Sequence, residues 1–476
     1  MSAGPQLSFH RGLPTALFTL LTAAAILSFV LGAGFAAFAT LFGDAAPAIL
    51  VAIALAPLWV LAVLANPLFG AFSVFATFPV GSVGTPLGFV TVQAVEAAVL
   101  VVGMLIVLQR LGASRTPLPW SPPLTWALAL LGWSLVSFYS AVDTVLALKQ
   151  IISLAGGIVF ACVVLAACRH MIDLRNLLAG FVGVAALISL TALSSGDRFE
   201  SRFGGSAVVS GRLQGAFDHP NQLGSLCALA APIAVAFVLG ARTFRVRVVS
   251  GGALALVLAA LMLSLSRGAW IGAGLAFAFM LVALPEARRL VVLFALPAII
   301  VALFVPSFAP QSSEVQVVGA RARALTELSP YDDRGDIYDE ALREIRSEPI
   351  TGVGPGGFPV ASARASSEAR LVSAKHAHSL GLTWAAETGL PGLFLIVGFA
   401  IALGLGARAA GRAALARGDA GDRAIAAGVA AALLSVAGQG LFDYTLRNAV
   451  VHIALWGMIG AVLVCRREAG RGYPVR

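Results

Sequence analysis

Long apolar stretches alternate with short polar connections along most of the chain. A run of roughly 17 to 25 apolar residues is long enough to cross a bilayer as a helix, and about fourteen candidates are present. They lie near residues 14–42, 46–65, 67–82, 88–108, 124–140, 145–167, 174–193, 222–240, 247–265, 268–285, 289–306, 380–407, 423–441 and 449–465. The third and tenth are the weakest. The pattern predicts an all-α integral membrane protein, a polytopic bundle of about 12–14 transmembrane helices.

Two connections are longer than the others, residues 194–221 and residues 307–379. The second is too long for a loop without secondary structure, so we expect it to contain helices and to be functional. The chain is therefore divided into N-terminal transmembrane helices, a first loop, central transmembrane helices, a large helical loop, and C-terminal transmembrane helices with a tail. The bounds are 1–193, 194–221, 222–306, 307–379 and 380–476.

The large loop contains the stretch DDRGDIYDEALREIRSEP, whose apolar positions have the spacing of an amphipathic helix of about three turns. These positions are Ile337, Ala341, Leu342 and Ile345. Asp332 or Asp333 would cap the start of the helix, and Pro349 would stop it. The glycines of the following ITGVGPGGF allow tight turns and exposed backbone N–H groups. Such a loop could cradle an anion, but we interpret it as a connector.

Composition and charge agree with a membrane protein. Apolar residues form 59% of the chain and charged residues only 12%, with a mean hydropathy of +0.91, whereas ordinary globular domains carry roughly 25% charged residues. Lys and Arg collect in every second connection, which predicts cytoplasmic termini and places both long loops on the periplasmic side. The net charge of +9 then reflects topology and does not indicate binding to nucleic acid.

Two further features of the sequence argue against a cleaved signal peptide and against a structure held by cysteines. The first apolar run exceeds the roughly 7 to 15 residues of a signal-peptide core, so we interpret it as a retained helix. The cysteines lie in or beside apolar segments, which argues against a disulfide framework or a cysteine metal site. They are Cys162, Cys168, Cys227 and Cys465.

The predicted topology brings four ionisable residues to one outer face. Arg267 interrupts two apolar runs, which favours a functional role over a snorkelling anchor. Arg212, taken alone, would be a solvated loop charge. His376 and His378 are two residues apart and do not share a helical face, although a loop or strand could direct both at one ligand. We expect one histidine to act as a base and the other to be structural.

The segment from His378-Ser379 to Gly389-Leu-Pro-Gly392 resembles a signature of bacterial O-antigen ligases. That signature is His, then Asn, Ser or Gln, nine residues, and Gly-x-x-Gly. GRLQGAFDHPNQLG, SRGAW and RGDIYDEALREIRSEPITGVGPGGF are similar to recurrent segments of the wider ligase and polymerase superfamily, in the same order. The resemblance covers most of residues 200–445, and His376 is an addition to the pattern.

The resemblance implies a GT-C-like membrane glycosyltransferase. Family members transfer a glycan from undecaprenyl diphosphate, on the periplasmic face of the inner membrane, to a sugar hydroxyl of lipid A core or of another glycan. His378 matches the family's general base, and Arg212 and Arg267 match the positions that hold the diphosphate. An imidazole titrates near neutral pH, and a guanidinium grips phosphate oxygens in pairs. Further predicted contacts to substrate are Arg334, His376, Lys375, Gly354, Gly389 and Gly392.

We expect no metal and no other cofactor, because diphosphate is a good leaving group and two cations can replace a metal. The carboxylates of YDDRGD, which are Asp332, Asp333 and Asp336, could hold a divalent ion, but helix capping explains them more simply. The expected partners are the lipid-linked glycan donor, the lipid A core or glycan acceptor, and membrane lipids.

Three other functions stay open: a polysaccharide polymerase of the same superfamily, a lipid-linked oligosaccharide transporter, and a scaffold without chemistry. A transporter site would lie near the midplane of the membrane, whereas the ionisable residues within apolar runs, chiefly Glu96 and Lys149, lie nearer the ends. The joint occurrence of both arginines and the histidine signature argues against a scaffold. Tyr444 and Arg447, in the turn LFDYTLRN, are interpreted as interfacial anchors.

Overall fold

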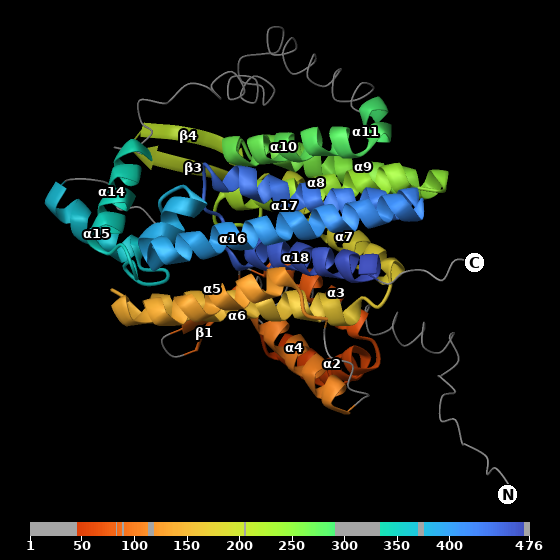
Figure 1. The fold of residues 1–476 in the computed structure, drawn as a ribbon, viewed down its shortest axis with the longest axis horizontal. Helices are drawn as coiled ribbons and strands as arrows, with labels where there is room; N and C mark the ends of the chain where they lie inside the picture. The colour runs from red at the N-terminus through yellow and green to blue at the C-terminus, as the bar shows by residue number, and fades with distance from the viewer. Residues whose placement is uncertain are drawn as a thin grey trace, which may run out of the picture.

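The computed structural model describes residues 45–81, 83–87, 90–112, 119–203, 206–290, 334–369 and 376–470. Most of these residues are helical, and the helices run side by side in an elongated bundle (Figure 1). The predicted run at 14–42 and nearly all of the run at 289–306 lie outside the described residues. The prediction of an all-α polytopic membrane protein is confirmed.

The helices follow the predicted apolar runs closely. In chain order they are α2 (Ala45–Ala65), α3 (Pro67–Ala76), α4 (Ala94–Gly112), α5 (Pro122–Ser137), α6 (Thr144–Ala167), α7 (Met171–Ser195), α8 (Pro220–Gly240), α9 (Phe244–Leu263), α10 (Arg267–Ala283), α11 (Pro285–Leu290), α14 (Arg334–Ser347), α15 (Phe358–Ala369), α16 (Leu380–Arg417), α17 (Ala420–Gly440) and α18 (Ala449–Gly470). Two 3₁₀ turns, Phe78–Val80 and Phe138–Ser140, follow α3 and α5.

Eight helices of the described residues are long and apolar enough to span a membrane: α4, α6, α7, α8, α9, α16, α17 and α18. The weakest predicted runs correspond to α3 and α10, which are indeed shorter apolar helices. Proline begins some of these helices, because the first turn of a helix does not need its N–H group as a donor. Pro67 and Pro220, for example, stand in the first turn of α3 and α8, where no intrahelical donor is needed.

Two short antiparallel hairpins interrupt the helical pattern, and the sequence did not predict them. The first pairs β1 (Gly84–Leu87) with β2 (Val90–Gln93), directly before α4. The second pairs β3 (Arg198–Phe203) with β4 (Ser206–Leu213), within the predicted first loop. In this second hairpin Phe199 lies opposite Arg212, so the strand pairing fixes the backbone at a residue that the sequence singled out.

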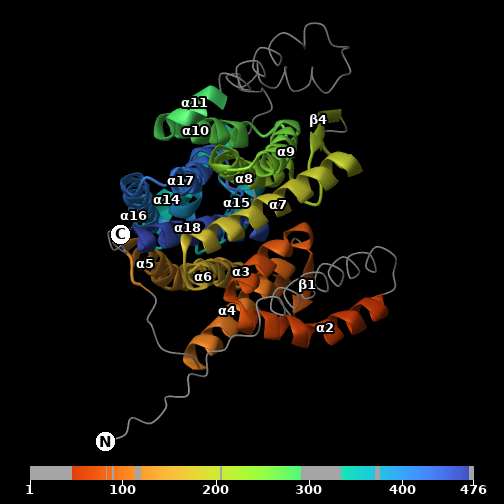
Figure 2. The ribbon, with the colours of Figure 1, turned by 90° about the vertical axis from the view of Figure 1, so that its right-hand side faces the viewer.

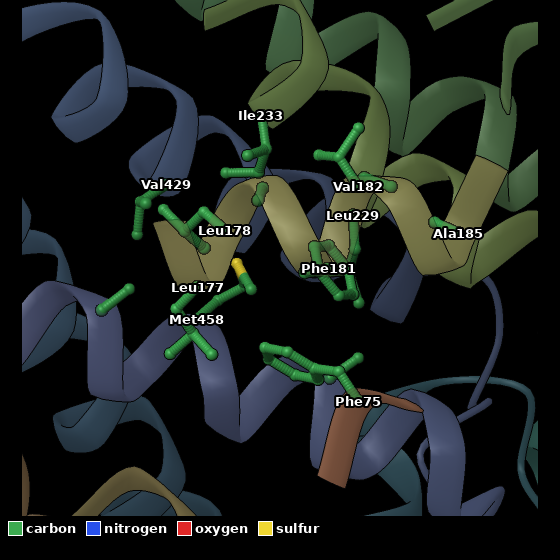
Figure 3. Packing of buried hydrophobic residues seen from close by; sticks show 14 of the residues in the cluster. Phe75, Leu177, Leu178, Phe181, Val182, Ala185, Leu229, Ile233, Val429 and Met458 are labelled. Carbon is green, nitrogen blue, oxygen red and sulfur yellow. The ribbon is translucent and has the colours of Figure 1, made fainter. Parts of the chain in front are cut away.

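The core of the bundle lies around α18, which is buried on every side. It contacts α6, α7, α8, α16 and α17, as expected for a helix that is apolar around its whole circumference. Figure 3 shows Met458 of α18 beside Leu177 and Phe181 of α7, with Phe75 of α3 completing the contact. Small residues allow close approach elsewhere: a Cβ added to Gly157 would lie 2.2 Å from the Trp456 ring.

The described part of the large loop folds as two helices against the start of α16. On α14, Ile337, Ala341 and Ile345 pack with Phe358 at the start of α15 and with Ala386 of α16, so the predicted amphipathic helix is confirmed. Leu342 is instead 39% exposed, because it lies one residue, about 100° of helical turn, away from the packed stripe. The predicted caps Asp332 and Asp333 lie outside the described residues.

One end of the bundle gathers the irregular elements. The β3–β4 hairpin, α14 and α15 lie there, at the left of Figure 1, and α8, α10, α16 and α18 begin there. We call this the hairpin end. α18 ends at the other end of the bundle (Figure 1), where Arg175 pairs with Asp419 and Asp422. Figure 2 views the bundle from that side, with α7, α8, α16 and α17 around α18. Which end faces the periplasm, and the five domain bounds, stay predictions.

Candidate functional site

His378 lies just before α16, in a backbone conformation that few residues adopt. Its φ is +47°, in the left-handed region that disfavours residues with a Cβ. The next residue, Ser379, caps the helix by accepting the Leu382 N–H. In this arrangement the His378 Nδ1 atom lies 3.3 Å from Oδ1 of Asp443. Strained backbone of this kind collects at functional sites, where surrounding contacts hold it.

Asp443 lies in the turn between α17 and α18 and is only 4% exposed. Its Oδ1 also accepts the Tyr444 N–H at 2.8 Å, and its Oδ2 accepts from Nδ2 of Asn221. Burial alone would raise the pKa of Asp443, but the hydrogen bond with His378, the nearby imidazoles and the Tyr444 N–H hold that pKa well below its usual range. The carboxylate is therefore ionised, and it favours a proton on the Nδ1 of His378.

Asn221, in the first turn of α8, continues this chain of contacts to Arg212. Its side-chain oxygen accepts from Nη2 of Arg212, while its amide nitrogen donates to Asp443. Arg212 is buried, at 7% exposure, and its Nε donates to the Ser264 carbonyl at 3.0 Å. Asp443 and Asn221 thus link His378, the predicted base, to Arg212, which is predicted to hold the diphosphate.

Arg267 is the first residue of α10. It follows directly on the turn whose Ser264 carbonyl accepts a hydrogen bond from Arg212. The turn runs from Ser264 through Leu265, whose φ is +51°, to Ser266, which caps α10 by accepting the Ala269 N–H. Arg267 is half-buried. Its neighbour Gly268 packs toward Asp443, since an added Cβ would lie 3.8 Å from the Asp443 Cβ. The three predicted catalytic residues are therefore brought to one place at the hairpin end.

His376 packs beside His378 and is held neutral. Its Nδ1 accepts the His378 N–H at 3.3 Å, and the two ring centroids are 4.4 Å apart. Burial first, and then the neighbouring His378 and Arg447, lower the pKa of His376 to about 3, against the opposing effect of Asp443. Because its Nδ1 accepts a hydrogen bond, the neutral ring carries its proton on Nε2, 4.0 Å from Asp443 Oδ1. This suits the structural partner that the sequence predicted.

Residues 252–397 match the family model described as O-antigen ligase. The match covers 146 of the 476 residues, so this segment is similar to O-antigen ligases. The matched residues include Arg267 and His378, whereas Arg212, Asn221 and Asp443 lie outside them. This similarity supports a membrane enzyme of the glycosyltransferase type within the ligase and polymerase superfamily.

No curated protein matches the chain significantly. Among solved structures, a chain from a peptidoglycan synthase complex that coordinates polymerization and crosslinking is similar at 21% sequence identity and a TM-score of 0.40. The alignment covers 73% of this chain and 98% of that chain. A likeness of this degree carries no argument about the reaction of this chain.

The Gly-x-x-Gly motif of the matched segment breaks α16. Gly389 has a φ of +72°, and a Cβ there would lie 2.0 Å from the Ile350 carbonyl oxygen. The break lets the Leu390 N–H donate to the Pro349 carbonyl at 2.9 Å. A Cβ at Gly392 would lie 1.9 Å from Thr388 Oγ1. Protein atoms thus fill the space beside both glycines, and close packing accounts for them.

The glycine-rich connector packs in the same way against the start of α6. Gly354 has a φ of +91°, and its added Cβ would lie 2.3 Å from the Ala141 Cα. The interpretation as a connector therefore has a physical basis, and substrate contact by Gly354 stays a prediction. Arg334 is the first residue of α14, but its side chain lies outside what the structure describes, as does the whole of Lys375.

One described cluster has the composition of a metal site. The ligand atoms of His376, His378 and Asp443 all lie within 4.8 Å of one another, and two imidazoles with a carboxylate are suitable ligands for zinc. A hydrogen-bonded arrangement satisfies the same atoms, because His378 Nδ1 faces Asp443 and His376 Nδ1 accepts a backbone N–H. Asp336, from the YDDRGD cluster, lies on α14 and is not part of this group.

Sequence reasoning missed the residues that join these side chains. Glu387 of α16 is 4% exposed, accepts the Gly356 N–H at 2.9 Å through Oε2, and pairs with Arg447 through Oε1. Arg447 also lies 5.9 Å from the centre of the Tyr444 ring, and Tyr444 is itself buried. These two predicted anchors therefore belong to a buried network beside the site, and the turn LFDYTLRN carries Asp443 as well.

Proposed function

We propose that the chain is a metal-independent glycosyltransferase of the O-antigen ligase type. It transfers a glycan from undecaprenyl diphosphate to a sugar hydroxyl of lipid A core, on the periplasmic face of the inner membrane, with both termini in the cytoplasm. The chain of contacts from His378 through Asp443 and Asn221 to Arg212 carries this proposal. These contacts connect a base, His378, to a cation, Arg212, at the hairpin end of the bundle.

His378 acts as the general base. Asp443 accepts its Nδ1–H, which leaves the Nε2 lone pair to receive a proton from the acceptor hydroxyl. The hydroxyl oxygen then bonds to the anomeric carbon of the donor as the bond from that carbon to the diphosphate oxygen breaks. Asp443 stays ionised throughout, orients the imidazole and stabilises the imidazolium.

Arg267 and Arg212 stabilise the departing diphosphate. Arg267, which is half-buried, contacts the phosphate oxygens. Arg212 is buried, donates to Ser264 and Asn221, and contributes a fixed positive charge. Fixed cations in a site of low dielectric stabilise developing negative charge strongly, because they need no reorganisation during the reaction. The large loop acts as a helical lid, and the apolar faces of the bundle receive the prenyl chain.

The test is an in vitro transfer assay with purified protein and undecaprenyl-diphosphate glycan. Lipid A core and unextended repeat units are offered as separate acceptors, with His378→Ala and Arg267→Ala assayed alongside. We expect transfer to lipid A core, its loss in His378→Ala, and weaker donor binding in Arg267→Ala. Chain growth on repeat units alone would instead identify a polymerase, and donor binding without transfer to either acceptor would favour a transporter.

A further inference from the structure

Two imidazoles and one carboxylate at the hairpin end have the spacing of metal ligands. Nδ1 of His378 lies 3.3 Å from Oδ1 of Asp443, and Nε2 of His376 lies 4.0 Å from the same oxygen. Tetrahedral ligands with bonds of about 2.0–2.1 Å to zinc are about 3.3–3.4 Å apart. The first separation therefore fits a bound ion as it stands, and the second fits after a shift of less than about 1 Å.

Other contacts hold the carboxylate in the orientation that an ion requires. Oδ1 of Asp443 accepts the Tyr444 N–H at 2.8 Å, and Oδ2 accepts from Nδ2 of Asn221. Contacts of this kind behind a metal ligand strengthen metal binding about 10- to 100-fold. Asp443 is ionised, whereas Arg447, a cation that acts on the same histidines, is paired with Glu387. The negative charge of Asp443 therefore remains available to a cation.

The types of ligand decide which cation fits. Imidazole nitrogens suit Zn²⁺ and similar transition-metal ions, whereas Mg²⁺ and Ca²⁺ prefer sites built from oxygen. Three protein ligands with a fourth position for water form the open type of zinc site. The side chains of His376 and His378 are 20% and 30% exposed, so an ion can reach them from the hairpin end.

We propose that His376, His378 and Asp443 reversibly bind Zn²⁺ or a similar transition-metal ion, and that the bound ion inhibits transfer. The ion occupies Nδ1 of His378, and the proton of that ring moves to Nε2. In this tautomer Nε2 has no lone pair for the proton of the acceptor hydroxyl, so the base is lost. His376 binds through Nε2 and carries its proton on Nδ1, which gives up the long 3.3 Å hydrogen bond from the His378 N–H. Each ring keeps one proton, so binding releases none.

The two parts of this inference have different foundations. Binding of the ion follows from the geometry alone and does not depend on the proposed function. Inhibition rests on the proposed function, because it requires His378 to be the base. The ion is an inhibitor and not a cofactor, which is consistent with transfer that needs no metal.

Titration of the full chain with Co²⁺ tests the binding. The protein is purified in detergent without a polyhistidine tag, stripped with EDTA and dialysed. We expect the strong visible absorption of four-coordinate Co²⁺, and its loss when Zn²⁺ displaces the ion. His376→Asn should weaken Co²⁺ binding at least about 10²-fold, since even outer contacts are worth about 10- to 100-fold. His170→Asn is the matched control: His170 is an exposed helix-capping histidine before α7, and Asn caps as well.

Equal Co²⁺ binding by the wild type and His376→Asn would overturn the site, as would a wild-type spectrum of six-coordinate Co²⁺ only. His378→Asn removes a second ligand and should show the same loss, so the test does not depend on one variant folding.

Transfer assayed with increasing Zn²⁺ tests the inhibition. The wild type should lose activity over the range in which Zn²⁺ displaces Co²⁺, and EDTA should restore it. Each variant is compared with its own rate without the ion, and inhibition of His376→Asn should require at least about 100-fold more Zn²⁺. Transfer that continues unchanged while the site is saturated with Zn²⁺ would leave the binding site standing and would refute both the inhibition and the assignment of His378 as the base.

Discussion

Replacing Asp443 by asparagine tests the proposed base most directly. The carboxylate offers one oxygen to His378 and Tyr444 and the other to Asn221. An asparagine has one oxygen and one NH₂ group, so it cannot accept at both sides. If its NH₂ group faces His378, the imidazole must accept at Nδ1 and carry its proton on Nε2. If its NH₂ group faces Asn221, two donors oppose each other in a buried position.

The size of the effect follows from these two outcomes. In the first, His378 has the wrong tautomer and cannot receive the proton of the acceptor, which removes a general-base contribution of about 10²- to 10⁴-fold. In the second, a buried donor is left unsatisfied at a cost of about 1–3 kcal/mol, and the position of Asn221 and Arg212 changes. We therefore expect kcat to fall about 10²- to 10⁴-fold, with little change in the KM for the lipid-linked donor.

The assay is steady-state transfer to lipid A core at saturating acceptor, with thermal unfolding measured on the same preparation. Asp419→Asn is the matched control, because Asp419 is a helix-capping carboxylate paired with Arg175 at the opposite end of the bundle. A purely structural role would shift the unfolding temperature and the donor KM together. A kcat within tenfold of wild type, in a variant that unfolds at the same temperature, would refute the proposed pairing of base and carboxylate.

Three further outcomes are expected. Gly389→Ala places a Cβ 2.0 Å from the Ile350 oxygen at a φ of +72°, so denaturant titration should show a loss of about 1–3 kcal/mol, whereas Gly404→Ala, with no atom within 4 Å, should not be destabilised. EDTA should leave the transfer rate unchanged and added Zn²⁺ should lower it by occupying the imidazoles; loss of activity in EDTA that divalent ions restore would contradict metal independence. The pKa of His376 is about 3 in the folded protein, against an ordinary value of 6.5, so the unfolded chain gains a proton first as the pH falls from about 6.5 toward 3. Unfolding temperature should drop across that window, and less steeply in His376→Gln.

The helical architecture could be predicted because each transmembrane helix is specified by its own stretch of sequence. Apolar runs located α6, α7 and α18 within a few residues, since a helix in a bilayer satisfies its backbone internally and requires only sufficient length. The spacing of Ile337, Ala341 and Ile345 likewise predicted a packed face on α14. The β3–β4 hairpin was missed because its strands are short and carry several charged or glycine residues, and no alternating pattern marks them.

The candidate site could be predicted only in part, because its contacts join distant segments. Arg267 was identifiable as an arginine within apolar sequence, and His378 through its signature. Asp443 lies 65 residues beyond His378 and 222 beyond Asn221. No local pattern in the sequence indicates that these side chains are in contact. Glu387 was overlooked inside an apolar run, where a buried carboxylate has meaning only with its partners.

The buried carboxylate of Glu387 explains how His378 and Asp443 keep their spacing. His378 precedes α16, and Asp443 lies in the turn after α17, so no single element holds both. Glu387 contacts Gly356 of the connector and Arg447 of the turn that carries Asp443. A buried ion pair adds little net stability, but leaving either partner unpaired is costly, so the pair disfavours any sliding of α16 past the turn. The 3.3 Å separation of His378 and Asp443 therefore depends on a contact nine residues along α16, beside the glycine that breaks the helix.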